Sequence, residues 1–231
     1  MTSLTVRVDA LLTGRAKPYS RPNSFSGIDK QPRTGSVYLG ELGFDGDEQG
    51  DRRVHGGPDK AVHHYAFEHY ARWRAELGPL PVLRRPGAFG ENISTLGLDE
   101  TQVCLGDRFN LGGAVLEVSQ GRQPCWKLNE RFGVEDMAPR VQTTGRTGWY
   151  YRVLSAGSVT VGDRIELTAR PHPTWPLSRL SALLFGRELA PEMLEPALQL
   201  PLVASWRKVI ERRLQQREIE DWSRRLDGPA R

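Results

Sequence analysis

Two similar stretches decide the fold: Leu-Gly-Asp-Arg-Phe-Asn-Leu at residues 105–111 and Val-Gly-Asp-Arg-Ile-Glu-Leu at residues 161–167. Each has a Gly-Asp turn that enters an alternating run of apolar and polar residues, which is typical of a strand with one buried face. Apolar, β-rich runs at 115–118 and 150–153 predict further short strands. Because several short strands alternate with turns, the sequence predicts a mainly β fold with a β-barrel core.

The segment that follows places Cys125 between a strand and a helix. A glycine and a proline break the β-rich run at 115–118, and residues 126–132 have helical character. A helix that begins near Cys125 would favour its thiolate, as would the neighbouring charges of Arg122 and Lys127. Such a turn suits a thiolate metal ligand or nucleophile. The alternative is that Cys125 is a small buried apolar side chain, and this stretch taken alone favours that alternative.

The two cysteines are expected to differ in role. Cys104 and Cys125 are separated by 21 positions and lack the spacing of a zinc site or a disulfide framework, which indicates a reducing compartment. Cys104 lies in a strand-like run at 101–105 with no basic residue nearer in sequence than Arg108. We expect a buried, structural thiol with a raised pKa that neither ligates metal nor reacts quickly.

Composition and charge limit the function classes. The chain has 32 basic and 28 acidic residues, and a net charge of +4 is too small to indicate nucleic-acid binding. A basic pocket for an anionic ligand would account for that excess equally well. The chain has no run of about 18 apolar residues, and its start lacks the apolar stretch of a signal peptide. The expectation is a cytoplasmic protein without a membrane segment.

Two glycine-rich polar loops are candidate binding loops. The first, at 40–62, contains His-Gly-Gly-Pro-Asp-Lys, in which His55 and Lys60 could donate to a phosphate or a similar anion. A tight turn with a capping aspartate explains that run equally well. Its acidic residues lack the ligand spacing of a calcium-binding EF-hand. The second loop, at 87–93, contains Asn92, which could bind a ligand, although bracing of the loop is the favoured interpretation.

A third loop, between residues 14 and 33, mixes turn-forming and basic residues. Its basic groups could face an anion, either from an ordered turn region or from a mobile lid. A solvated loop is the favoured interpretation, because scattered charges in a loop usually face water.

Helices are expected mainly at the C-terminus. Residues 67–77 predict one packing helix, and after a proline-rich linker three more stretches have helical periodicity: 177–185, 191–200 and 203–226. We therefore expect a barrel domain at residues 1–170 and a three-helix segment at residues 176–231. The helical segment would pack on the barrel or on a partner subunit, and a homodimer is among the expected assemblies.

Five stretches in this order together resemble the MOSC domain, named from the C-terminal part of molybdenum cofactor sulfurases, and within it the YiiM-type proteins. They are residues 41–51, 55–65, 87–98, 119–128 and 144–149. Their joint order is more specific than any one motif. The resemblance covers most of residues 1–170, and the C-terminal helices resemble the three-helix segment of the YiiM type. It implies a MOSC-type β-barrel followed by that segment.

The resemblance also implies a ligand and its site. The family binds the molybdenum cofactor (molybdopterin), and the cysteine that matches Cys125 ligates the metal, as a soft thiolate suits a soft metal centre. Cys125 thereby becomes the candidate metal ligand and catalytic residue. The candidates for holding the phosphate and pterin of the cofactor are His55, Lys60, Asn92, Arg122 and Arg146. Where the family commonly has Gln-Pro-Arg, this chain has Gln-Gly-Arg at 120–122, which gives the turn more freedom.

The resemblance also implies, for some members, the reduction of N-hydroxylated compounds. The leading functional hypothesis that follows from it is a molybdenum-dependent oxidoreductase that detoxifies N-hydroxylated bases, or related small molecules, by reducing them to the parent amines. Because the sequence has no flavin or nicotinamide fingerprint, the electrons are expected from a separate redox partner. The alternative is a non-catalytic molybdenum cofactor carrier or sulfur-handling protein. A third hypothesis is a plain binding module for an anionic ligand. Metal analysis combined with turnover separates these hypotheses.

Overall fold

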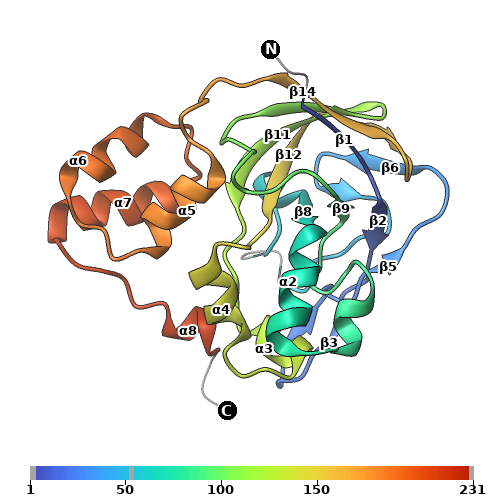
Figure 1. The fold of residues 1–231 in the computed structure, drawn as a ribbon, viewed down its shortest axis with the longest axis horizontal. Helices are drawn as coiled ribbons and strands as arrows, with labels where there is room; N and C mark the ends of the chain where they lie inside the picture. The colour runs from blue at the N-terminus through green and yellow to red at the C-terminus, as the bar shows by residue number, and fades with distance from the viewer. Residues whose placement is uncertain (1–3, 52–54, 229–231) are drawn as a thin grey trace.

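The fold is built on a nine-stranded sheet (Figure 1). The computed structural model describes residues 4–51 and 55–228. In order across the sheet, the strands are β1 (Thr5–Arg7), β14 (Arg164–Ala169), β10 (Arg108–Leu111), β11 (Ala114–Gly121), β12 (Trp149–Ser155), β8 (Val62–Ala66), β9 (Ile93–Thr95), β2 (Ala10–Thr13) and β5 (Gln31–Pro32). Among these described strands, β8 and β9 pair in parallel and the other neighbours pair antiparallel.

Both Gly-Asp stretches form the turns and strands that the sequence predicts, and the strands β10 and β14 pair with each other. In each turn the aspartate carboxylate accepts a hydrogen bond from the backbone N–H three residues earlier. Asp107 accepts from Cys104 at 2.9 Å, and Asp163 accepts from Thr160 at 2.8 Å. The glycine before each aspartate has a positive φ, 78° and 97°, which a residue with a Cβ rarely adopts. The pair Gly-Asp is therefore needed for the turn itself.

The N-terminal segment connects the two ends of the sheet. β1 pairs with β14, and the Val8 N–H donates to the Asp163 carbonyl at 2.9 Å. The next residue, Asp9, donates to the Ser94 carbonyl at 3.0 Å, and β2 then pairs with β9. The sheet is therefore curled, and the short segment that contains β1 and β2 contacts both of its ends. The sheet-rich fold is confirmed, but the pairing of the described residues forms no closed ladder, so a closed barrel stays a prediction.

Smaller sheets and an apolar core complete the sheet part. A three-stranded sheet contains β13 (Gly157–Val159), β6 (Val37–Gly40) and β7 (Gly43–Phe44), and a hairpin contains β3 (Lys17–Pro18) and β4 (Phe25–Ser26). The curled sheet encloses Phe109, Leu116 and Tyr151, all fully buried. Burial of these large apolar side chains is the main stabilising contribution of this part.

Within the described residues, three helices and two 3-10 turns cover the sheet part: η1 (Pro58–Lys60), α2 (Glu68–Leu77), η2 (Pro81–Arg84), α3 (Lys127–Phe132) and α4 (Met137–Thr144). α2 is the packing helix predicted from the sequence. It buries Tyr70 and Trp73 in a second apolar cluster, which also contains Phe89. α4 has no counterpart among the predicted helices, because Pro139 and the threonines at its end weaken the helical pattern.

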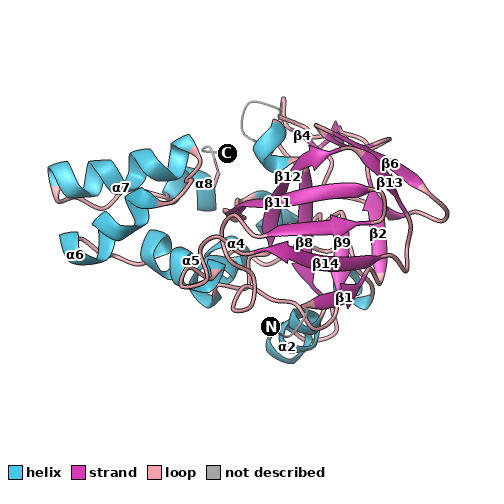
Figure 2. Ribbon diagram, turned by 90° about the horizontal axis from the view of Figure 1, so that it is seen from above, coloured by secondary structure: helices cyan, strands magenta, loops and turns pink. Residues whose placement is uncertain are grey.

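The C-terminal helices lie to one side of the sheet (Figure 2). They are α5 (Leu177–Phe185), α6 (Pro191–Leu194), the 3-10 helix η3 (Glu195–Gln199), α7 (Ala204–Gln216) and α8 (Ser223–Leu226). The predicted helix at 203–226 is wrong in extent, because Arg217 has a left-handed conformation with a φ of 57° and ends α7. Within the described parts of the chain, no helix is both long and apolar enough to cross a membrane.

Trp206 attaches the helical segment to the sheet. Its side chain is fully buried. A Cβ atom at Gly121, the last residue of β11, would lie 3.3 Å from the Trp206 ring and 3.3 Å from the Ser181 Oγ. The glycine at this position therefore lets α5 and α7 approach the end of β11. Of the two arrangements that the sequence left open, packing on the sheet part is the one observed.

Cys104 is buried near the linker to the helices. Its Sγ lies 3.7 Å from the Pro173 carbonyl, and burial, followed by the charge of Asp107, raises the pKa of the thiol. The expected buried thiol with a raised pKa is confirmed. The strand-like run at 101–105 is not a strand, since it contributes one isolated bridge between Cys104 and Pro176.

Arg213 ties the helical segment together. Its guanidinium is fully buried and donates to the Leu183 and Leu184 carbonyls, at 2.9 and 2.7 Å, at the end of α5. It also pairs with the Glu220 carboxylate at 2.8 Å. One buried side chain therefore satisfies the end of α5 and fixes the chain that follows α7.

We predict that Arg213→Met lowers the free energy of unfolding by about 3–5 kcal/mol, because it leaves the Glu220 charge and two carbonyls without their donor. The exposed neighbour Arg212 provides the control, and Arg212→Met should change stability by less than about 1 kcal/mol. Urea unfolding followed by circular dichroism measures both. Equal stabilities for the two variants would contradict the role given to Arg213.

Candidate functional site

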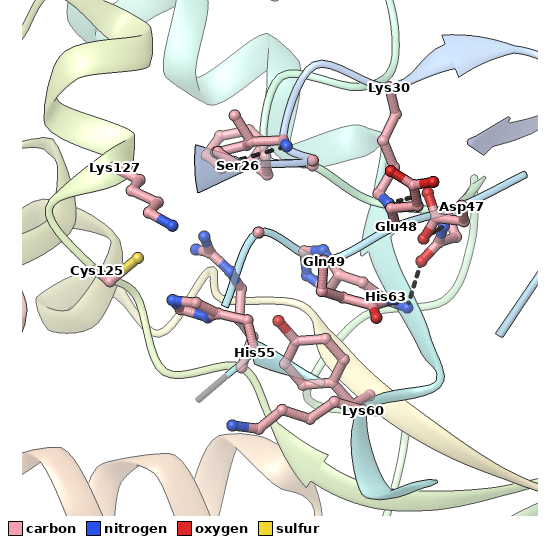
Figure 3. A pocket seen from close by; sticks show the side chains of 18 of the residues that line it. Ser26, Lys30, Asp47, Glu48, Gln49, His55, Lys60, His63, Cys125 and Lys127 are labelled. Carbon is pink, nitrogen blue, oxygen red and sulfur yellow. Dashed lines mark hydrogen bonds and ion pairs between the residues drawn. The ribbon is translucent and has the colours of Figure 1, made fainter. Parts of the chain in front are cut away.

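A pocket with about 630 Å³ of open space lies beside Cys125 (Figure 3). Its walls come from residues 26–30, 47–50, 89–92 and 122–127, with His55, Lys60, His63 and Tyr150 between them. Because these segments are far apart in the sequence, the pocket exists only in the folded chain.

Strand pairing brings several of these residues together. Gln120 on β11 lies opposite Tyr150 on β12, and Tyr150 lies opposite His63 on β8. The Asn92 N–H donates to the His63 carbonyl at 2.7 Å, which adds the start of β9 to the same row. Residues from three neighbouring strands, together with the residue that precedes β9, therefore meet at one place on the sheet, close to Arg122.

Cys125 occupies the turn between β11 and α3, as the sequence predicts. Its side chain is 7% exposed, and Figure 3 shows its sulfur between Lys127 and His55. Burial raises the pKa of the thiol, but a hydrogen bond from His55, the charges of His55 and Arg122, and the Lys127 backbone N–H outweigh burial and lower that pKa to about 6. Cys125 is therefore a thiolate at neutral pH, in contrast to the Cys104 thiol.

Two lysines add positive charge near the thiolate. Burial lowers the pKa of both Lys60 and Lys127, and the Cys125 thiolate opposes that shift in each. The Lys127 Nζ donates to the Phe25 carbonyl at 2.6 Å, which ties the Cys125 turn to β4. An anion entering the pocket would therefore meet cationic groups from separate segments of the chain.

Arg122 holds the turn before Cys125 and keeps one donor available. Its backbone N–H donates to the Gly148 carbonyl at 2.9 Å, and its side chain forms a hydrogen bond with Tyr150. The Arg122 Nη1 is buried and has no hydrogen-bond partner within residues 4–51 and 55–228. A buried donor without an acceptor is unfavourable, so this atom could be satisfied by a bound anion.

Across the pocket from the thiol, a polar network braces the wall (Figure 3). Lys30 pairs with one carboxylate oxygen of Asp47. The Asn92 Nδ2 donates to the other oxygen at 2.9 Å and to the Leu12 carbonyl at 3.1 Å. The Asn92 Oδ1 accepts from the His63 N–H at 3.0 Å. The side chain of Asn92 therefore braces its loop, which is the interpretation that the sequence favours.

The structure brings together most of the candidate residues. Those that line this pocket are His55, Lys60, Asn92, Arg122 and Cys125. Arg146 is not among them. Its Nη2 donates to both carboxylate oxygens of Glu76 at 2.8 Å, and its Cζ lies 3.6 Å from the centre of the Trp73 ring. Arg146 lines a second cavity, between α2, α4 and α5.

Some of the other lining residues had no clear signal in the sequence, among them Lys30, Asp47, His63 and Tyr150. Lys30 is 7% exposed, so the interpretation of residues 14–33 as a solvated loop is wrong at this position. Its partner Asp47 lies in another loop, and a pairing of that kind has no local pattern. Burial, and then the charge of Arg122, lower the pKa of His63 well below its usual value, so its ring is neutral.

Comparison with known proteins identifies related chains. Residues 51–166 match the MOSC domain, and residues 175–217 match the YiiM-like, 3-alpha helix domain. Protein YiiM of Escherichia coli (strain K12) is 38% identical over 93% of this chain and 94% of that protein. A protein named Reductase from Gibberella moniliformis (strain M3125 / FGSC 7600) is 40% identical over 82% of this chain, which spans 34% of that longer protein.

The structural similarity extends over the same length. The crystal structure of YiiM from Escherichia coli has a TM-score of 0.81 and 34% identity with this chain, covering 96% of this chain and 98% of that one. The first matched domain contains the turn of Cys125, and the second contains α5 to α7. This chain therefore belongs to the MOSC domain family and has the YiiM-like three-helix segment after it.

Proposed function

We propose that this protein binds a molybdenum cofactor through Cys125 and reduces N-hydroxylated bases or related N-hydroxylated compounds. The observation that carries the proposal is the position of the Cys125 thiol, which lines a pocket together with His55, Arg122 and Lys127. Against the effect of burial, these neighbours lower its pKa to about 6 and favour the thiolate. A thiolate is a soft ligand and suits a soft metal centre. The related protein named Reductase supports a redox activity.

The residues of the pocket fit such a cofactor. The described side chains include no group of three or more His, Cys, Asp or Glu that could hold a metal ion. Cys125 would accordingly be the protein ligand, with further ligands from the cofactor itself. His55, Lys60 and the Arg122 Nη1 would hold the anionic phosphate of the cofactor. When bound, the cofactor supplies the two-electron redox chemistry.

The chain itself contributes binding, orientation and charge. His55 donates to the Cys125 thiolate and keeps it deprotonated, so that it is ready to ligate metal. The network of Lys30, Asp47 and Asn92 keeps the opposite wall in place. Reduction of an N-hydroxyl group consumes two electrons and two protons, breaks the N–O bond and releases water. We assign the supply of electrons to a separate redox partner.

We predict that Cys125→Ser abolishes molybdenum content and turnover with little change in fold, because a hard hydroxyl is a poor substitute for a soft thiolate. Cys104→Ala is the matched control and should keep both properties, at a stability loss of about 1–2 kcal/mol. The measurements are metal analysis of purified protein and reduction of an N-hydroxylated base with an artificial electron donor. Full molybdenum occupancy in Cys125→Ser would refute the ligand assignment.

The same experiment separates a reductase from a carrier. A cofactor carrier would retain molybdenum in the parent protein yet fail to reduce any N-hydroxylated substrate with the artificial donor. A plain anion-binding module would contain no molybdenum in either form. Both molybdenum and turnover in the parent protein are expected.

We predict that Cys125 is alkylated in cofactor-free protein with a rate that rises with pH, reaches half its maximum near pH 6, and is flat above about pH 8. The direction follows from the thiolate being the reactive form. His55→Gln removes a hydrogen bond and a charge that lower the pKa, so its midpoint should move to higher pH. Iodoacetamide labelling in a Cys104→Ala background, followed by mass spectrometry, measures the profile. A midpoint above pH 8 in the parent would contradict the thiolate.

A further inference from the structure

The last described residues of the chain return from the helical segment to the turn of Cys125 (Figure 1). After α7 ends, residues 218–228 run back to the sheet part, and α8 lies next to α3 and α4. We call residues 218–228 the C-terminal strap. The strap lies beyond both matched domains, which end at residues 166 and 217.

The strap contacts the chain on both sides of Cys125. The Arg225 Nη1 donates to the carbonyl of Pro124, the residue before the thiol. The Arg225 carbonyl accepts from the N–H of Trp126, the residue after it, at 2.8 Å. One residue of the strap therefore holds both peptide groups that flank Cys125, and so limits the directions in which its side chain can point.

Further bonds keep the strap in this place. The Asn129 Nδ2, on α3, donates to the Leu226 carbonyl at 2.9 Å, and an Arg21 Nη2 donates to the Asp227 carbonyl at 2.9 Å. The strap is thus fixed to the loop before β4 and to α3, whose first residue, Lys127, lines the pocket.

The Arg225 side chain also joins the strap to the helices. Its Nη2 donates to the Gln142 Oε1 on α4, and its Cζ lies 4.6 Å from the Trp222 ring and 5.9 Å from the Phe185 ring on α5. A partly buried guanidinium is unfavourable unless its N–H groups find acceptors, and here the acceptors are provided by the Cys125 turn and by α4.

We propose that the C-terminal strap positions the Cys125 turn, with Arg225 as a positioning residue for the thiolate. For the identity of the metal that the thiolate ligates, this inference rests on the proposed function. Groups that orient a metal ligand commonly change metal affinity or activity by about 10-fold to 100-fold when they are removed. In this protein the orienting group comes from the end of the chain, by way of the helical segment.

The test compares Arg225→Met with Arg224→Met in the full-length protein. Arg225→Met removes the donors to Pro124 and Gln142 and keeps a long side chain, whereas Arg224 is an exposed neighbour on the same short helix. Arg225→Met should speed amide hydrogen exchange in residues 122–132 and lower molybdenum content, each by about tenfold. Exchange in β11 and β12 should stay at the parent rate, which a general loss of stability would not allow. In the metal-loaded fraction, the KM for an N-hydroxylated base should be unchanged.

A second variant covers a failure of Arg225→Met to fold. Arg225→Lys keeps one donor for the Pro124 carbonyl but cannot also reach Gln142, so its exchange and metal content should be intermediate. Parent-like exchange in residues 122–132 with parent-like metal content, in the folded Arg225 variants, would overturn the proposal. Faster exchange spread over the whole sheet would overturn it in favour of general packing. If the parent protein contains no molybdenum, the proposed function fails, and the exchange of the Cys125 turn alone decides the role of the strap.

Discussion

The negative charge of the Cys125 thiolate lies where burial alone would remove it, and the surrounding donors and cations keep it in place. His55 comes from the glycine-rich stretch at 40–62, Arg122 belongs to the turn itself, and Lys127 begins α3. Each of these groups must be held within reach of one sulfur atom, because the attraction between charges weakens with distance. The arrangement of the loops around the sheet can be understood as the means of meeting that one requirement.

The curled sheet brings these groups near the Cys125 sulfur, because it places strands that are distant in the sequence next to one another. The strands β11, β12, β8 and β9 are neighbours in the sheet. The loops that adjoin these four strands therefore lie close together. Side-chain positions there are fixed by the register of backbone hydrogen bonds, which tolerates no slip without turning buried residues outward. Functional loops carried on such a scaffold can vary in sequence while the place where they meet stays constant.

Sequence patterns predicted those features that depend on residues close together in the chain. The Gly-Asp turns, the strands that follow them and the position of Cys125 before a helix all rest on adjacent residues, and the structure has them. The burial of Lys30 depends on Asp47 in a separate loop, and the position of Arg146 depends on Glu76 on α2, so neither had a local signal. The end of α7 at Arg217 was also not predicted. The left-handed residue at the end of a helix is usually a glycine, and an arginine at that position gives no signal in the sequence. The return of the strap to Pro124 is a further contact between distant residues.

The crossing of the N-terminal segment from one end of the sheet to the other has a consequence for the order of folding. β1 pairs with β14, which lies at the far end of the sheet part in the sequence, while β2 pairs with β9. During synthesis, β1 therefore cannot pair with β14 until nearly the whole sheet part has been made. Pairing over so long a separation has a large loop-closure entropy and is slow. Until then, β1 has no partner strand, which makes a nascent chain vulnerable to pairing with the wrong strand.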